Sequence, residues 1–316
     1  MKRTIIFFII LLPIAVSADA RTVELTLHPA KSPKPEQKYQ LLAKADGQRN
    51  ADAAPLYEKA IQSLPSGLKM DEINQWLKTP PDRLPEKQVQ STLEQLKPTL
   101  ELLEQAAKCK QCDWPYLDDD TLSQTLANYR RFTFFLALQA RFQIARGRYD
   151  GAINTMQTGF GMARHLGEDP SLVRGLVGVG IAAYICRQLE QFVQRPDAPV
   201  LNEALRDLPQ PFIDLTEQVE WEDPDIKEKV HLQMNRLDRY VAALQCIEAI
   251  RLYAAVHDGK FPKKLSDVKL VPVPDDPVTH KAFVYTWTGT KAVLEMPALK
   301  GTTERDTMRY ELSLKE

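Results

Sequence analysis

The spacing of hydrophobic residues changes once along this chain, and the change limits what the chain can fold into. Through the middle, apolar residues recur every three or four positions, as Leu93, Leu96, Leu100 and Leu103 do, which is typical of amphipathic helices. Near the carboxyl terminus they alternate with polar residues, as over 308–314, which is typical of strands with one apolar face. We therefore expect a mainly α protein with a small α+β part at its C-terminal end.

The helical part is predicted to span residues 37–224 as packed hairpins. Gly147 separates helical patterns over about 121–146 and 150–165, and so short a connection requires the two helices to lie antiparallel. Pro98 is expected to kink or split the helix over 88–108. Gly175 and Gly178 lack the spacing of a dinucleotide-binding loop, so they indicate a close helix-packing surface within 171–194.

Residues 225–316 are predicted to form an α+β domain in which a long helix, about 225–256, covers a three-stranded antiparallel sheet. The strands are expected around Phe283–Trp287, Ala292–Met296 and 308–314, because their apolar residues alternate. Glu248 and Arg251 fall at the margin of the helix's apolar stripe. We expect them to form a structural ion pair that contributes little if it is exposed.

The first twenty residues have the pattern of an export signal. Lys2 and Arg3 precede a short apolar run that ends in Ala18-Asp19-Ala20, as in a secretory signal peptide. We expect residues 1–20 to be removed and the protein to act in the periplasm or cell envelope; the alternative is an uncleaved anchor, the chain's single expected membrane contact. Residues 21–36 are predicted to be a short strand and a proline-rich linker. The formal net charge of −1 argues against a nucleic-acid partner.

Four cysteines suit a compartment that permits disulfides. Cys109 and Cys112 follow a helical pattern rather than begin one, so the helix dipole disfavours a redox-active pair. A local Cys109–Cys112 disulfide or two reduced thiols remain, and Cys186 and Cys246 are expected to be buried thiols. The five histidines stand singly without ligand spacing, so the sequence predicts no metal site.

Parts of the helical region resemble tetratricopeptide-type repeats. Gly147, Tyr149, Ala152 and Ile153 match the turn of such a repeat. Ala53, Tyr57, Ala60, Ile61 and Pro65 match its second helix, although Gly159 replaces the usual alanine in the following hairpin and no clean period runs through the chain. The resemblance implies stacked helices that bind peptides or partner proteins.

The C-terminal part resembles the globular heads of type II secretion pseudopilins. The resemblance rests on the helix ending Arg251 to Pro262, with Gly259-Lys-Phe-Pro, on Asp276-Pro and on Tyr285. The combination of signal, helical middle and this tail is similar to uncharacterised exported bacterial proteins. Some two hundred residues separate the apolar N-terminus from this part, so filament assembly is not implied.

No Gly-x-Ser-x-Gly, His-Glu-x-x-His or Walker loop occurs in the chain, and Ser66-Gly-Leu-Lys69, which fits Ser-x-x-Lys, lacks the partner motifs of penicillin-binding enzymes. The sequence therefore gives no catalytic residue, no cofactor and no metal ligand. We expect an exported, non-enzymatic binding or scaffold protein with a protein or peptide partner. The alternatives are an exported hydrolase with a site between the two parts, or an accessory of a secretion system.

Overall fold

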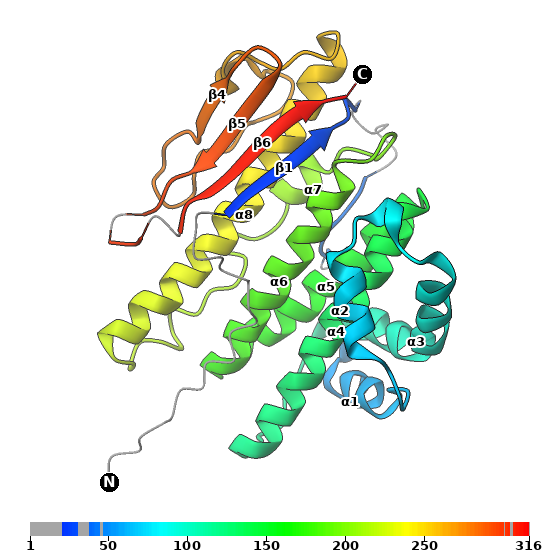
Figure 1. Ribbon diagram of the computed structural model, residues 1–316. Helices are drawn as coiled ribbons and strands as arrows, with labels where there is room; N and C mark the ends of the chain where they lie inside the picture. The colour runs from blue at the N-terminus through cyan, green and yellow to red at the C-terminus, as the bar shows by residue number, and fades with distance from the viewer. Residues whose placement is uncertain (1–20, 31–37, 45–46, 300, 304–305, 316) are drawn as a thin grey trace.

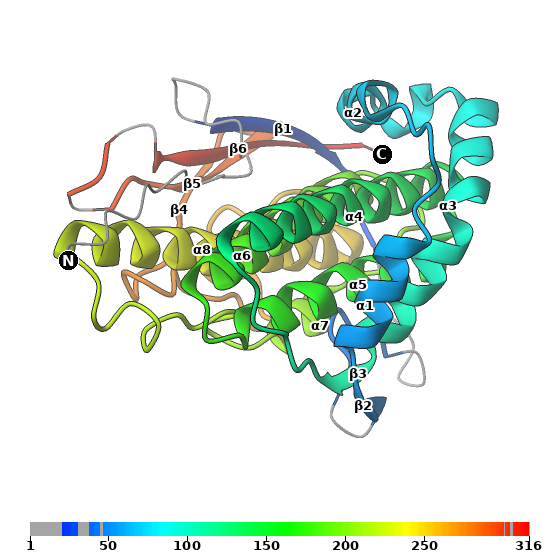
Figure 2. The ribbon, with the colours of Figure 1, turned by 90° about the horizontal axis from the view of Figure 1, so that it is seen from below.

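The computed structural model describes residues 21–30, 38–44, 47–299, 301–303 and 306–315. The predicted signal at 1–20 and most of the proline-rich linker lie outside these residues. Within them, the protein is mainly helical with a small mixed sheet, as the spacing of hydrophobic residues predicts (Figure 1). The sheet lies over α8 and α6, and α3 lies at the right-hand end of the molecule (Figure 2).

The helices are α1 (Ala54–Gln62), α2 (Met70–Lys78), α3 (Glu86–Ala107), α4 (Asp119–Ala145), α5 (Tyr149–Gly167), α6 (Leu172–Phe192), α7 (Asn202–Arg206) and α8 (Pro224–Val256), with 3-10 turns η2 (Pro81–Arg83) and η3 (Leu265–Asp267). The strands are β1 (Arg21–Leu27), β2 (Arg49–Asp52), β3 (Cys109–Gln111), β4 (Val284–Trp287), β5 (Lys291–Met296) and β6 (Met308–Leu314). The long helices thus begin and end within a few residues of the positions that the sequence predicts.

The sheet corrects the expected three-stranded antiparallel arrangement. Strands β4, β5 and β6 do pair antiparallel, but β1 adds a fourth strand parallel to β6, in the order β1-β6-β5-β4. Leu25 and Leu27 of β1 are buried in the same core as Tyr310 and Leu312 of β6. The predicted strand at the N-terminus is therefore part of the C-terminal sheet, and no local pattern could identify a partner almost 290 positions away.

Three helix starts are fixed by side chains that accept a backbone N–H. Asp118 accepts from Thr121 N before α4, Ser171 from Arg174 N before α6, and Asp223 from Asp225 N before α8. Such caps satisfy donors that a helix start leaves unpaired. Asp118, Ser171 and Asp223 thus fix the starts of α4, α6 and α8.

Helices α5 and α6 approach closely through glycines, which confirms the predicted packing surface. A Cβ at Gly178 would lie 2.6 Å from the carbonyl oxygen of Ala163, and one at Gly159 would lie 2.5 Å from the side chain of Ile185. The α4–α5 hairpin turns at Gly147, whose φ of +65° favours glycine.

Two other expectations for the helical part change in the structure. Helix α3 continues through Pro98 as one helix and is not split. The predicted helical region from residue 37 instead contains β2, which pairs parallel with β3, and the first helix begins at Ala54 after Asp52 accepts its N–H. Short polar strands of this kind carry little periodicity, so the sequence did not reveal them.

The ion pair of α8 is buried and does not lie at the edge of the apolar stripe. Arg251 and Glu248 are 0% and 1% exposed and lie 2.7 Å apart. Arg251 also donates to the carbonyl oxygens of His28 and Ala198, so loops from elsewhere in the chain cover this face. The predicted structural ion pair is therefore confirmed, but its place at the margin of the apolar stripe is corrected to a buried one, because the sequence did not show this cover.

Helix α6 is long and apolar enough to cross a membrane by length and composition, but 67% of its most apolar window is buried inside the protein. It lies between α4, α5 and α8 (Figure 2). Helix α6 thus has the environment of a core helix.

Candidate functional site

A groove of about 640 Å³ opens between α3, α4 and α5. Its apolar lining comes from Leu93 and Leu100 of α3 and from Leu136 and Phe142 of α4. The α4–α5 hairpin forms one wall because Gly147 turns the chain back, and α3 forms the other wall. An apolar floor between helices with polar groups at its edges is a common way to bind a peptide.

Amide side chains supply much of the polar lining. Gln139 and Gln143 come from successive turns of α4, and Asn154 comes from α5. Thr155 Oγ1 donates to Gln143 Oε1 at 2.8 Å, which directs the Gln143 NH₂ group toward Gly151, where the lack of a side chain leaves room for it. An amide both donates and accepts, so these groups can bind the backbone of a peptide.

The charged residues that line the groove are balanced, three carboxylates against three cations, and several of them form ion pairs. Glu104 lies 2.6 Å from Lys108, and Arg146 lies 2.6 Å from Glu86. Burial opposes ionisation of Glu104, but hydrogen bonds from Lys108 and Asn154 outweigh it and lower its pKa. The groove therefore has little net charge of its own, and shape and amide hydrogen bonds would select its ligand.

Pro98 adds one further acceptor beside the groove. Proline has no N–H, so the carbonyl oxygen four residues earlier, that of Glu94, lacks its usual helical donor. Glu94 lines the groove. The residue that the sequence marked as a helix breaker thus leaves a backbone acceptor next to the floor.

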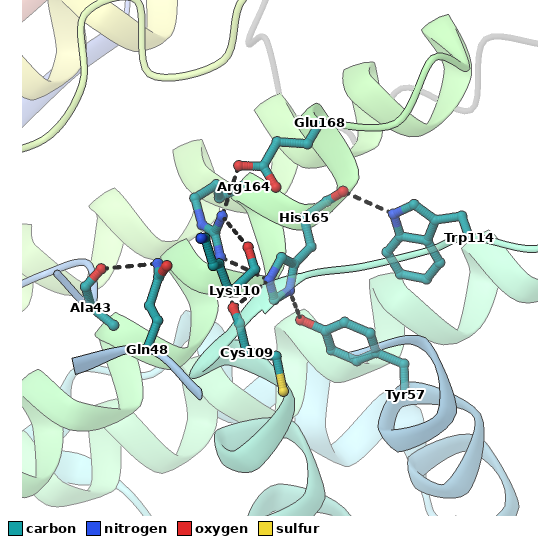
Figure 3. A network of polar contacts seen from close by, with 9 residues as sticks. All are labelled: Ala43, Gln48, Tyr57, Cys109, Lys110, Trp114, Arg164, His165 and Glu168. Carbon is teal, nitrogen blue, oxygen red and sulfur yellow. Dashed lines mark hydrogen bonds and ion pairs between the residues drawn. The ribbon is translucent and has the colours of Figure 1, made fainter. Parts of the chain in front are cut away.

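A buried polar cluster joins α1, β3 and α5 around His165 (Figure 3). His165 Nδ1 lies 2.9 Å from Tyr57 Oη, and Trp114 Nε1 donates to the carbonyl oxygen of His165 at 2.8 Å. Arg164 binds His165 Nε2 at 2.8 Å and donates to the carbonyl oxygen of Cys109 at 3.0 Å. Tyr57 also stacks on Trp114, with ring centroids 5.5 Å apart.

These contacts hold His165 in the neutral form. His165 Nε2 lies 2.8 Å from Arg164, a donor, and 3.0 Å from the carbonyl oxygen of Cys109, an acceptor, and Nδ1 lies 2.9 Å from Tyr57 Oη, so each ring nitrogen of the neutral imidazole has a partner in either tautomer. Burial first, and the charge of Arg164 second, lower the pKa of His165 to about 4. Tyr57 and His165 are fully buried, so a substrate has no access and the cluster is structural.

A second buried cluster connects the helical part to the sheet. Glu190 of α6 accepts from Arg21 through both oxygens, at 2.9 and 2.8 Å. Tyr240 of α8 and Tyr310 of β6 donate to the same carboxylate at 2.6 and 2.9 Å. One acidic side chain thus holds the first and last strands and two helices together.

Cys109 and Cys112 are both thiols in the structure. Cys109 lies in β3, and its Sγ donates to the carbonyl oxygen of Gln105. Three residues of extended chain span about 10 Å, more than the roughly 7 Å that a disulfide tolerates between Cα atoms. The disulfide stays a prediction, and it would require the segment after β3 to bend. Burial raises the pKa of both thiols, which makes them poor nucleophiles.

The groove does not have the features of a hydrolase site. Its lining includes no serine, cysteine or histidine. Its carboxylates, Glu94, Glu101 and Glu104, all come from α3. Among the described residues, no group of three His, Cys, Asp or Glu side chains is placed to hold a metal ion. The sequence predicted Leu93 and Leu100 as part of the apolar face of a helix but did not predict a groove there; the other signal was the helical hairpin around Gly147.

Comparison of the chain with known protein families, curated proteins and solved structures found no match.

Proposed function

We propose that this chain is an exported, non-enzymatic binding or scaffold protein of the cell envelope that holds a protein or peptide partner in the groove between α3, α4 and α5. The observation that carries the proposal is the groove itself, about 640 Å³ in volume, with an apolar floor and a lining rich in amides. This combination suits an extended or helical peptide better than a small charged metabolite.

Export is part of the proposal and rests on the sequence of residues 1–20. The resemblances support the same reading: tetratricopeptide-type hairpins bind peptides between helices, and pseudopilin-like heads belong to envelope proteins. The hairpin of α4 and α5 forms a wall of the groove, which is the element that carries the first resemblance.

Photo-crosslinking in intact cells tests the proposal. A photoreactive phenylalanine analogue replaces Gln90, an exposed glutamine that lines the groove on α3. The matched control replaces Gln62, an exposed glutamine at the end of α1 outside the groove. We expect a discrete crosslinked species from position 90 and none from position 62.

Fractionation of the same cells locates the protein. Equal crosslinking from both positions, or a protein retained in the cytosol, would contradict the proposal. Reduction of crosslinking by Asn154→Ala, which removes an amide from the opposite wall, would show that the partner occupies the groove itself.

A further inference from the structure

Two aromatic side chains project into solvent at one end of the molecule. Tyr116 and Trp221 are 97% and 89% exposed, and Val173 is 44% exposed. Tyr116 precedes α4, Val173 lies in the first turn of α6, and Trp221 precedes α8. All three helices begin toward the lower part of Figure 1. We call Tyr116, Val173 and Trp221 the aromatic end.

Hydrogen bonds hold the two loops that carry Tyr116 and Trp221 to one buried ion pair. Arg174 and Asp169 lie 2.9 Å apart and are buried. Arg174 donates to the carbonyl oxygen of Pro115, next to Tyr116, at 2.8 Å. Gln218, three residues before Trp221, donates to the carbonyl oxygen of Asp169 at 3.3 Å. Both loops are therefore fixed to the same support.

The two segments that carry the exposed rings are acidic. No lysine or arginine occurs within 111–129 or within 207–226. The acidic residues of these two segments are Asp113, Asp118, Asp119, Asp120, Asp207, Asp214, Glu217, Glu220, Glu222, Asp223 and Asp225. Lys227 lies close by but donates to a backbone carbonyl oxygen, that of Glu220. Carboxylates thus outnumber cations in the two segments that carry the exposed rings.

Exposed large aromatic side chains fixed on a rigid support are unusual on a protein surface and are frequent where a partner binds. The charge decides which partner fits. Carboxylates repel anionic lipid headgroups, and they repel the same surface of a second copy. They attract lysine and arginine, and Trp and Tyr faces bind both cations and aliphatic side chains.

We propose that the aromatic end binds a basic segment of a partner protein that carries aliphatic residues among lysines and arginines. This surface is separate from the groove, whose lining includes neither Tyr116 nor Trp221. A protein with two such surfaces can bring two chains together, which goes beyond the proposed occupancy of the groove.

Fluorescence anisotropy with a short labelled peptide of lysine and leucine tests this proposal. The double variant Tyr116→Ser/Trp221→Ser removes the rings, and Glu217→Gln/Glu220→Gln removes two charges. We expect each to weaken binding by about tenfold or more. We also expect binding to the unmodified protein to weaken steeply between about 50 and 500 mM salt.

Matched controls separate this surface from general attraction to an acidic protein. Trp287→Ser removes a half-exposed tryptophan from β4, and Glu58→Gln/Glu203→Gln removes two exposed carboxylates elsewhere. We expect both controls to bind the peptide like the unmodified protein. Equal loss in the control variants, unchanged binding by the two test variants, or sedimentation of the protein with phosphatidylglycerol vesicles would overturn the proposal.

Discussion

The buried imidazole of His165 makes the clearest quantitative prediction for this protein. Its pKa is lowered from 6.5 to about 4, so the folded protein keeps His165 neutral where the unfolded chain binds a proton. The stability that depends on the neutral form is present above pH 6.5 and is lost as the pH falls toward 4. A pKa difference of this size lowers the free energy of unfolding by about 3 kcal/mol at pH 4 and by about 2 kcal/mol at pH 5.

Asp238 opposes this loss over almost the same pH range. Burial raises its pKa to about 6, against the hydrogen bond that its carboxylate accepts from Phe212 N. A raised carboxylate pKa means that the folded protein takes up a proton first, so folding is favoured as the pH falls through 6. We expect a gain of about 1 kcal/mol between pH 7 and pH 5. Asp238 therefore offsets about half of the loss from His165 in the unmodified protein.

Urea unfolding followed by circular dichroism at pH 7, 6 and 5 separates the two groups. The variant His165→Gln, which cannot take up this proton, should gain about 2 kcal/mol relative to the unmodified protein between pH 7 and pH 5. Asp238→Asn should lose about 1 kcal/mol over the same range. Differences between variants remove the contribution of all other groups. The same pH dependence in His165→Gln and the unmodified protein would refute the assigned neutral imidazole.

Two substitutions test the packing and the link between the sheet and the helices. Gly178→Ala places a methyl group against the carbonyl oxygen of Ala163, so thermal unfolding should show a loss of stability of about 1–3 kcal/mol. A stabilised protein would contradict the close approach of the two helices. Gly151→Ala, where the added methyl group meets a flexible side chain, serves as the control. Arg21→Met leaves the buried carboxylate of Glu190 without its cation and should cost about 2–4 kcal/mol in urea unfolding, whereas an unchanged midpoint would show that β1 does not depend on this pair.

Local signals predicted the helical elements well. Asp118, Ser171 and Asp223 cap the helices whose apolar rhythm follows them, because a cap and the first turns of its helix are neighbours in sequence. Gly178 was recognised as a packing residue because a glycine inside an apolar helical run has few other uses. The alternation in 308–314 likewise identified β6.

Non-local pairings were not predictable from the same patterns. The alternation of β1 shows that it is a strand, but nothing in its residues names β6 as its neighbour or makes the pairing parallel. The groove has the same origin, since α3 and the α4–α5 hairpin meet only after the chain folds. A period in the sequence defines which face of an element is apolar, and it does not define what covers that face.

The buried arginines show how irregular segments are attached to the helices. Three of them bind a carboxylate and at least one backbone carbonyl oxygen of a distant loop or strand: Arg174 binds Asp169 and Pro115 O, Arg239 binds Asp276 and Pro297 O, and Arg251 binds Glu248, His28 O and Ala198 O. A loop carbonyl has no partner in a helix or sheet, and burial without one is costly. A guanidinium has five donors, enough for a carboxylate and for such carbonyls. A lysine ammonium cannot bind the Asp169 carboxylate and the carbonyl oxygen of Pro115 with the geometry of a planar guanidinium. Arg174→Lys should therefore release the loop that carries Tyr116, although the positive charge is kept.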